Sequence, residues 1–562
     1  MKEKVLKVLK NPYFEIIAVY FLAHFFMLIL SGCWWDDWTF MTHDLGYINA
    51  VASQSGRPEW NLLVPLCWSL PNNGRILIFF LYLFISLFVY VILKNSGFFD
   101  ERKSLYIALI FSVFPVNDAR ILISNFAYTV GLFLFYLSFM LFVLWNRMEN
   151  GKRKNICRVF LLISFFFSFI LNSVLAYYYI IMAYLLVLMF IKNCKEGFIK
   201  RVIISIKDVL VSYPDFFVLP FVYYICNKVF FPTYGDTFGN YNSVTLDGFV
   251  KCLFYVPLSV LKVFSDVFLK GISCINLYTG LVLAVIAAVV WYFRNNTKEK
   301  EYSLTENILH LVCGVFVMMM AAFPYVMVRG RVIDTMGVKG RDAVLVSLGA
   351  AIILYSVICM FKGRLRKLLF SLVVGMFIIS CNFLYLEWQK DYYYQLSMER
   401  LFVDPVIRDN DTFFLVDLNE SQIEGQRYYS LNTNAYRVFK DETRFFVPKV
   451  SNLYILEDQK YMKNAIEALN YSHMMKDYKP DDYYFDAVLN YTNYLSDLDV
   501  LKFKYCEMFD REYFDDLIAG YGSMDIYVVE DDFTIRLLEK YDNEQLHGDQ
   551  DVLDLVLEFA GQ

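Results

Sequence analysis

The sequence predicts a mainly α-helical membrane protein of about eleven transmembrane helices, followed by a C-terminal α/β or α+β domain outside the membrane. Of its 562 residues, 58% are hydrophobic and 19% are charged, whereas soluble proteins hold roughly 25% charged residues. Residues 1–390 contain long apolar runs, and residues 391–562 hold 35 acidic against 16 basic residues. We therefore expect two domains with this boundary. The acidic second domain argues against a nucleic-acid partner.

Apolar segments long enough to cross a hydrocarbon core of about 30 Å recur throughout the first domain. The apolar run at 159–191 is interpreted as two short helices turning at Asn172, because basic clusters flank both of its ends. The eleven expected spans lie near residues 13–31, 76–93, 104–117, 121–145, 159–171, 174–191, 211–231, 277–293, 307–328, 343–361 and 368–386.

The distribution of basic residues predicts the orientation of these spans. With the N-terminus in the cytoplasm, the loops on the cytoplasmic side hold 24 Lys and Arg, and the opposite loops hold 10. Positive charge in short loops is retained on the cytoplasmic side. We therefore expect a multi-pass protein of the plasma membrane with a cytoplasmic N-terminus and an extracytoplasmic acidic domain.

The acidic domain is expected to combine strands and helices. Apolar runs at 412–416 and 444–447 predict strands, and the patterns at 457–469 and 533–541 predict helices. No catalytic signature is recognised in it. A folded cap over the outer face is the favoured interpretation, and contact with carbohydrate through its many tyrosines is the alternative.

Two adjacent carboxylates begin the first outer loop. Asp36 and Asp37 stand among Trp34, Trp35 and Trp38. An aromatic belt at the membrane boundary explains the indoles, but it requires no paired carboxylates, which are costly there unless solvated or paired. We therefore favour a functional role for the two aspartates, with the belt as the alternative.

Cations gather on the same predicted face, although four of them, at 329–342, oppose the positive-inside bias. Charge placed against that bias usually has an anionic partner, and arginine binds phosphate through two parallel hydrogen bonds. Pairing with Asp334, Asp342 or the acidic domain is the alternative. The candidate substrate- and phosphate-binding residues are Arg75, Asp118, Arg120, Arg331, Lys339 and Arg341.

With an acidic pair in a long first outer loop and cations on the same face, residues 1–390 resemble the GT-C superfamily of membrane glycosyltransferases. Asp36 and Asp37 match the acidic pair of that superfamily, whereas the arginines correspond by location only. The resemblance implies an enzyme that transfers a hexosyl or pentosyl group, with inversion, from a polyprenyl-phosphate sugar to a cell-surface or cell-wall glycan or a lipid-linked acceptor. Asp36 or Asp37 would be the general base.

Two aspects stay open at this point. A divalent cation, Mg²⁺ or Mn²⁺, on Asp36 and Asp37 is an alternative to catalysis without metal, because Mg²⁺ suits carboxylate and phosphate oxygens. A transporter or flippase for lipid-linked saccharides would use the same cations, but it needs polar groups through the membrane thickness. A polysaccharide polymerase or ligase is the third alternative, and the acidic pair favours the first interpretation over it.

Overall fold

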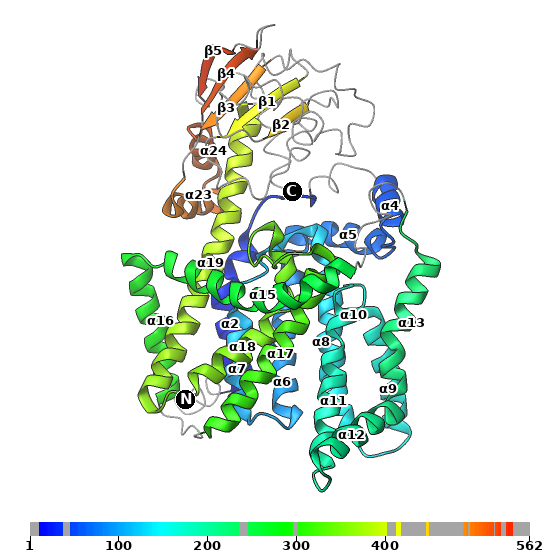
Figure 1. Cartoon of the computed structure of the whole chain (residues 1–562). Helices are drawn as coiled ribbons and strands as arrows, with labels where there is room; N and C mark the ends of the chain where they lie inside the picture. The colour runs from blue at the N-terminus through cyan, green and yellow to red at the C-terminus, as the bar shows by residue number, and fades with distance from the viewer. Residues whose placement is uncertain are drawn as a thin grey trace. The chain divides into compact units, whose positions relative to one another are not determined.

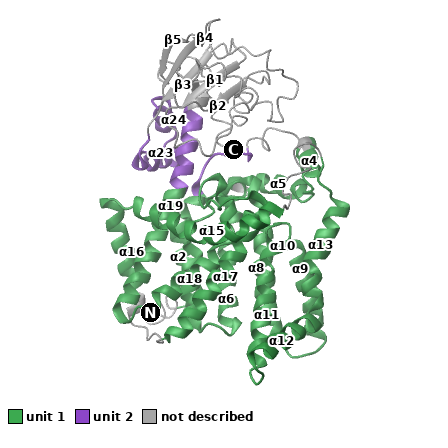
Figure 2. Cartoon of the chain, in the orientation of Figure 1, with its two compact units in different colours: residues 1–28, 45–384 green, residues 29–44, 385–562 purple. Residues whose placement is uncertain are grey.

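The chain forms two compact units (Figure 2). In the computed structural model the described residues are 11–37, 45–234, 246–295, 302–401, 412–417, 445–448, 487–492, 495–521, 523–529 and 535–542. Unit 1 comprises residues 1–28 and 45–384, and unit 2 comprises residues 29–44 and 385–562. The segment that carries Asp36 and Asp37 thus belongs with the C-terminal part of the chain, rather than with residues 1–390.

Unit 1 is built from helices, most of which run up and down in one bundle (Figure 1). Short 3₁₀ turns, η1 to η4, lie between some of them, at Pro71–Gly74, Asp118–Ile121, Ile123–Asn125 and Val338–Ala343. The α-helices are α2 (Pro12–Ile29), α4 (Leu45–Gln54), α5 (Trp60–Ser69), α6 (Arg75–Ser96), α7 (Glu101–Val113), α8 (Phe126–Asn146), α9 (Lys152–Ser168), α10 (Val174–Tyr177), α11 (Tyr179–Lys192), α12 (Phe198–Ser212), α13 (Pro214–Phe230), α15 (Leu246–Ser273), α16 (Leu277–Asn295), α17 (Leu304–Arg329), α18 (Ser347–Ile358) and α19 (Gly363–Leu401). The part of α19 after residue 384 belongs to unit 2.

Within the described residues, seven helical segments are long and apolar enough to cross a membrane, or eight if the bent pair α12–α13 is one span. Six of the seven contain α2, α6, α8, α11, α17 and α19, which coincide with expected spans, and the seventh is α15. The predicted count of eleven is therefore not confirmed. The helices at four other expected spans are shorter or more charged: α7, α9, α16 and α18.

Local sequence explains where several helices begin and end. Asp100 accepts hydrogen bonds from the backbone N–H groups of Arg102 and Lys103 and so begins α7. Ser303 and Glu306 form a capping box at the start of α17, which ends at Gly330 in the left-handed conformation. Both devices satisfy backbone groups that have no partner inside the helix.

Close approach of α17 and α18 depends on glycine. A Cβ atom at Gly349 would lie 2.5 Å from the backbone nitrogen of Met318, and one at Gly314 would lie 2.9 Å from that of Ile353. Ten of the twelve residues of α18 are buried. A short helix surrounded by protein is an expected exception to the length required of a lipid-exposed span.

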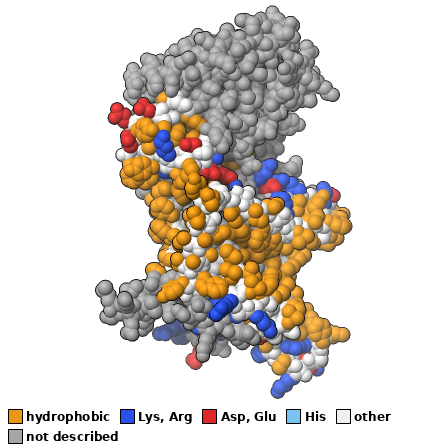
Figure 3. Space-filling view, turned by 90° about the vertical axis from the view of Figure 1, so that its left-hand side faces the viewer, with side chains coloured by type: hydrophobic (Ala, Val, Ile, Leu, Met, Phe, Trp, Pro, Cys, Tyr) orange, Lys and Arg blue, Asp and Glu red, His pale blue; other side chains and the backbone are white. Residues whose placement is uncertain are grey.

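Apolar side chains cover much of the surface of unit 1 between its two charged ends (Figure 3). Exposed residues of this kind are frequent on α12, α13, α15 and α16, among them Val211, Phe230, Leu253 and Leu281. An apolar surface of this extent is expected where helices face lipid rather than water.

The described part of unit 2 contains a five-stranded mixed sheet. Its strands are β1 (Thr412–Asp417), β2 (Phe445–Pro448), β3 (Ala487–Thr492), β4 (Ser523–Val529) and β5 (Ile535–Asp542), in the order β2-β1-β3-β4-β5. β1 is parallel to β2 and β3, whereas β4 is antiparallel to β3 and β5. Helices α23 (Asp497–Phe509) and α24 (Arg511–Ala519) lie between β3 and β4 in the chain.

Two sequence predictions for this region have clear outcomes. β1 and β2 lie at the two segments expected as strands. The helix expected at 533–541 is wrong, because Ile535–Asp542 is a strand whose backbone pairs with β4, from Ser523↔Asp542 to Val529↔Ile535. A neighbouring strand overrides the weak helical preference of a short segment. The helix expected at 457–469 lies outside the described residues.

Candidate functional site

A polar turn and a cation-bearing loop meet in unit 1. The turn contains Asn117 and Asp118, between α7 and α8, and the loop joins α17 to α18. The backbone N–H of Asn117 donates to the carbonyl of Thr335 (3.0 Å), and that of Gly337 donates to the carboxylate of Asp118 (3.1 Å). Because η2 and η4 pack together here, the two polar segments predicted separately from the sequence form one region.

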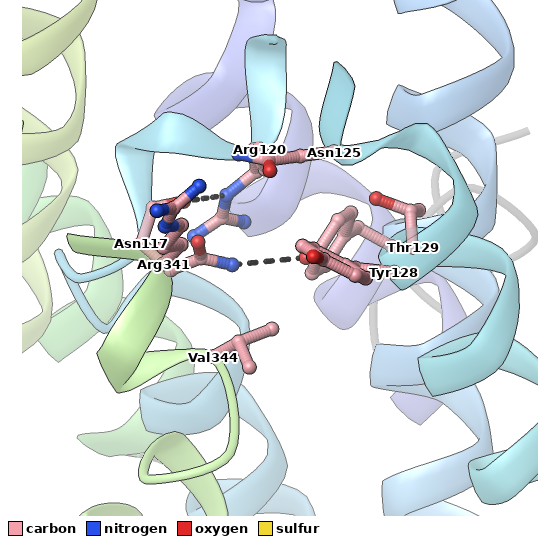
Figure 4. Close-up of a pocket in the computed structure, with 8 residues that line it drawn as sticks. Asn117, Arg120, Asn125, Tyr128, Thr129, Arg341 and Val344 are labelled. Carbon is pink, nitrogen blue, oxygen red and sulfur yellow. Dashed lines mark hydrogen bonds between the residues drawn. The ribbon is translucent and has the colours of Figure 1, made fainter. Parts of the chain in front are cut away.

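A small pocket opens at this junction (Figure 4). Its cavity volume is about 10 Å³, room for about one water molecule, and it is open to solvent on one side. In Figure 4, Arg120, Arg341 and Asn117 lie on one side of the pocket, and Tyr128 and Thr129 lie on the other. The lining residues are Tyr82, Asn117, Arg120, Asn125, Tyr128, Thr129, Arg341 and Val344.

The guanidinium group of Arg120 is held by the turn that precedes it. Its Nε donates to the carbonyl of Asn117 (2.8 Å), and one Nη donates to that of Val116 (2.6 Å). The group also lies 4.5 Å from the ring centroid of Tyr82, a cation–π contact. Asn117, at φ 55°, donates its side-chain amide to the Tyr82 hydroxyl (3.0 Å). These contacts fix the direction of a buried cation at the pocket.

The loop between α17 and α18 carries acids beside its cations. Arg329 lies 3.2 Å from the almost fully buried carboxylate of Asp342, and Arg331 lies 2.9 Å from Asp334. Burial raises the pKa of Asp342, and the neighbouring Arg329 and Arg341 oppose that rise. The pairing of Arg331 with Asp334 matches the alternative that the sequence left open for these cations.

The six predicted phosphate-binding residues take different places. Arg120 and Arg341 line the pocket, and Asp118 anchors the loop beside it. Arg75, 1% exposed, donates from Nε to the carbonyl of Ile121 (3.3 Å) and thus supports the end of the polar turn. Arg331 is paired at the loop surface, and Lys339 is exposed.

Asp36 and Asp37 lie in unit 2, separate from the unit that contains the pocket. The segment before them is held within unit 2, where Ser31 accepts from Lys504 (2.6 Å) and its N–H donates to Gln389 (3.1 Å). Asp37 is fully buried, whereas Asp36 is half-buried. Trp38, the third indole of the predicted motif, lies outside the described residues.

Sequence reasoning missed several residues of this region. Tyr82 and Thr129 line the pocket. For Tyr82 the sequence holds one signal, its spacing: it follows Arg75 by two helical turns and so lies on the same face of α6. Beside the pocket, Arg57 lies 5.4 Å from the ring centroid of Tyr128 and 3.5 Å from the carboxylate of Glu59. Burial raises the pKa of Glu59, and Arg57 opposes that rise.

The site has the chemistry of an anion-binding pocket. Two guanidinium groups, two side-chain amides and three hydroxyls line it, together with the rings of Tyr82 and Tyr128. No group of three or more His, Cys, Asp or Glu side chains suited to a metal is found in the part of the chain that the structure describes.

Comparison with known proteins adds no further assignment. No protein-family model, curated protein or solved structure matches this chain.

Proposed function

We propose that the protein is a membrane glycosyltransferase that uses a polyprenyl-phosphate sugar as donor and a cell-surface glycan or lipid-linked saccharide as acceptor. The observation that carries the proposal is the pocket where Arg120 and Arg341 meet at one end of an apolar helical bundle. A lipid with a phosphate head has the matching chemistry, because its chain requires an apolar environment and its head requires cations.

Arginine suits this role for a physical reason. Its guanidinium group stays charged when partly buried, and its planar donors match phosphate oxygens. Arg120 is already held by two backbone carbonyls and the ring of Tyr82. The guanidinium group is thus held in place before a ligand arrives, which reduces the entropy lost on binding.

The proposed reaction is a single displacement. An acceptor hydroxyl oxygen forms a bond to the anomeric carbon, while the bond from that carbon to the phosphate oxygen breaks and the phosphate leaves with the electron pair. The hydroxyl proton passes to Asp36 or Asp37. Cations stabilise the charge that develops on the phosphate, and a positioned base contributes roughly 10²–10⁴-fold.

The broader features of the proposal follow the sequence. They comprise eleven spans with a cytoplasmic N-terminus, a plasma-membrane location, and residues 391–562 on the outer side. Mg²⁺ or Mn²⁺ at Asp36 and Asp37 remains an alternative that removal of divalent ions in a transfer assay would test.

A transfer assay with the purified protein in detergent and a polyprenyl-phosphate sugar tests two claims, that the protein is a glycosyltransferase and that Asp36 or Asp37 is its general base. Asparagine keeps the size of aspartate but cannot take the proton, so Asp36→Asn or Asp37→Asn should lower turnover by roughly 10²-fold or more while the donor still binds. Near-wild-type transfer by both variants would remove the base role. No transfer by the wild type, together with movement of lipid-linked sugar across vesicles, would favour a flippase.

A further inference from the structure

We propose that α15 is an interfacial helix that lies along the outer surface of the bilayer with its apolar face in lipid, and that it does not span the membrane. By length and composition, α15 qualifies as a spanning helix, since it has 28 residues and contains an 18-residue stretch with a mean hydropathy of 1.7. Its placement within unit 1 points elsewhere. Figure 1 shows α15 crosswise to the bundle, over one end of α17 and α18.

The residues of α15 divide into three faces. Large apolar side chains form the exposed face, including Leu253 and Leu261, each 67% exposed, and Leu269, 64% exposed. Small and β-branched residues such as Val256, Val263 and Val267 form the buried face. A third, narrower face between these two carries Lys262, Asp266 and Lys270, four residues apart, whereas Asp247 and Lys251, near the start of the helix, lie on the exposed side.

This division is typical of a helix that lies in the membrane interface, with one face in lipid and a charged face toward water. A spanning orientation would instead place Lys262 and Asp266, close to the middle of the helix, near the centre of the hydrocarbon, where charge is expensive. The pair is 2.7 Å apart, and both side chains are about one-third exposed.

The hydrogen bonds of α15 give an independent argument. Ser259 accepts from the backbone N–H of Ile333 (3.2 Å), and Asp266 accepts from the hydroxyl of Thr335 (2.8 Å). Lys262 also lies 3.5 Å from Asp334. These partners follow the C-terminal end of α17 at Arg329. The middle of α15 therefore lies at the same membrane depth as the end of α17. If α15 crossed the membrane, its middle would lie at the bilayer centre, and the end of α17 would have to lie there too.

The interfacial position has a consequence for the pocket. Thr335, bound to α15 through its side chain, accepts from the backbone N–H of Asn117 through its carbonyl. Asn117 in turn lines the pocket. The helix thus sets the depth of the pocket relative to the lipid headgroups, through contacts that do not depend on which reaction the pocket serves.

The two ends of α15 test the proposal. Asp247→Cys and Lys270→Cys should react with a membrane-impermeant maleimide from the same side of the membrane in intact cells. Among the native cysteines, Cys194 is exposed, so labelling of the parent protein gives the background. Labelling of one end in intact cells and of the other only after lysis would show a span and overturn the proposal. Absence of labelling at both ends before lysis would also contradict it.

Lipid contact is measured separately with a photoreactive phenylalanine analogue in vesicles of phosphatidylglycerol and phosphatidylethanolamine. The analogue at Leu253 or Leu261 should crosslink to phospholipid, whereas the analogue at Tyr255, on the charged side of the helix, should crosslink several-fold less. Equal lipid crosslinking at all three positions, or none at the two leucines, would contradict the assigned faces. Neither measurement requires transferase activity, so a result that contradicts the interfacial position of α15 is distinct from one that contradicts the proposed function.

Discussion

At the residue scale, the pocket depends on side chains that the chain brings together from distant positions. Asp118 and Gly337, which join its two walls, are 219 positions apart. The sequence identified Arg120 and Arg341 individually, because cations on the predicted outer face are unusual. It did not identify Tyr82 or Thr129, because an aromatic or hydroxyl side chain is common in an apolar helix, and the spacing of Tyr82 from Arg75 becomes informative only once Arg75 is placed near the turn.

Asp342 predicts a pH dependence of anion binding. The pKa of its carboxyl is raised by burial, so it loses its negative charge at a higher pH than an exposed aspartate. Protonation of Asp342 removes the negative charge that offsets the positive charges of Arg329 and Arg341. Affinity for polyprenyl phosphate should therefore increase as the pH falls through the pKa of Asp342. Asp342→Asn should bind more tightly at neutral pH and show a weaker pH dependence.

The measurement is a binding titration of both proteins at several pH values. The phosphate itself titrates near pH 6, and the difference between the two proteins removes this contribution. Parallel curves for wild type and Asp342→Asn would exclude the carboxyl as the titrating group.

At the element scale, the sequence predicts the positions of most helices, but two segments depart from the prediction. One is the strand β5, and the other is the helix α15. Leu, Glu and Lys in 533–541 favour a helix locally, and the pairing with β4 that overrides this preference is absent from the local sequence. In α15, charges at four-residue spacing interrupt the apolar run, so the sequence predicts no span between 231 and 277, although one face of this helix is apolar throughout.

The contact between α17 and α18 gives a stability prediction with a matched control. Gly349→Ala places a methyl group 2.5 Å from the backbone of Met318 and should destabilise the protein, by about 1–3 kcal/mol as in other overpacked sites. Gly280→Ala, also in a helix, meets no atom closer than 3.9 Å and should be neutral or stabilising. Thermal unfolding in detergent measures both variants. Equal unfolding temperatures would show that the α17–α18 contact adapts without cost.

At the scale of the whole molecule, the membrane class followed from composition, because burial of so many apolar residues in one soluble core is not feasible for this chain length. The number of spans was less predictable, since short and charged helices inside a bundle do not satisfy criteria set by lipid exposure. The assignment of Asp36 and Asp37 to unit 2 was also beyond the sequence, because it depends on contacts with residues such as Gln389 and Lys504.

The predicted topology is tested by labelling one cysteine in each unit. A cysteine at Tyr505, 63% exposed in unit 2, should react with an impermeant reagent in intact cells. The native, exposed Cys194 lies in a predicted cytoplasmic loop and should react only after lysis. The reverse pattern would invert the orientation and move the pocket to the cytoplasmic side.

The most direct test of the central claim is the affinity of the purified protein for polyprenyl phosphate. A charge-assisted hydrogen bond is worth about 1.5–3 kcal/mol, so Arg341→Ala should weaken binding by roughly 10- to 100-fold. Arg153→Ala, which removes an exposed arginine from α9, serves as the control and should bind like the wild type. Unchanged affinity of a folded Arg341→Ala variant would contradict the claim that this pocket binds the phosphate of a lipid donor.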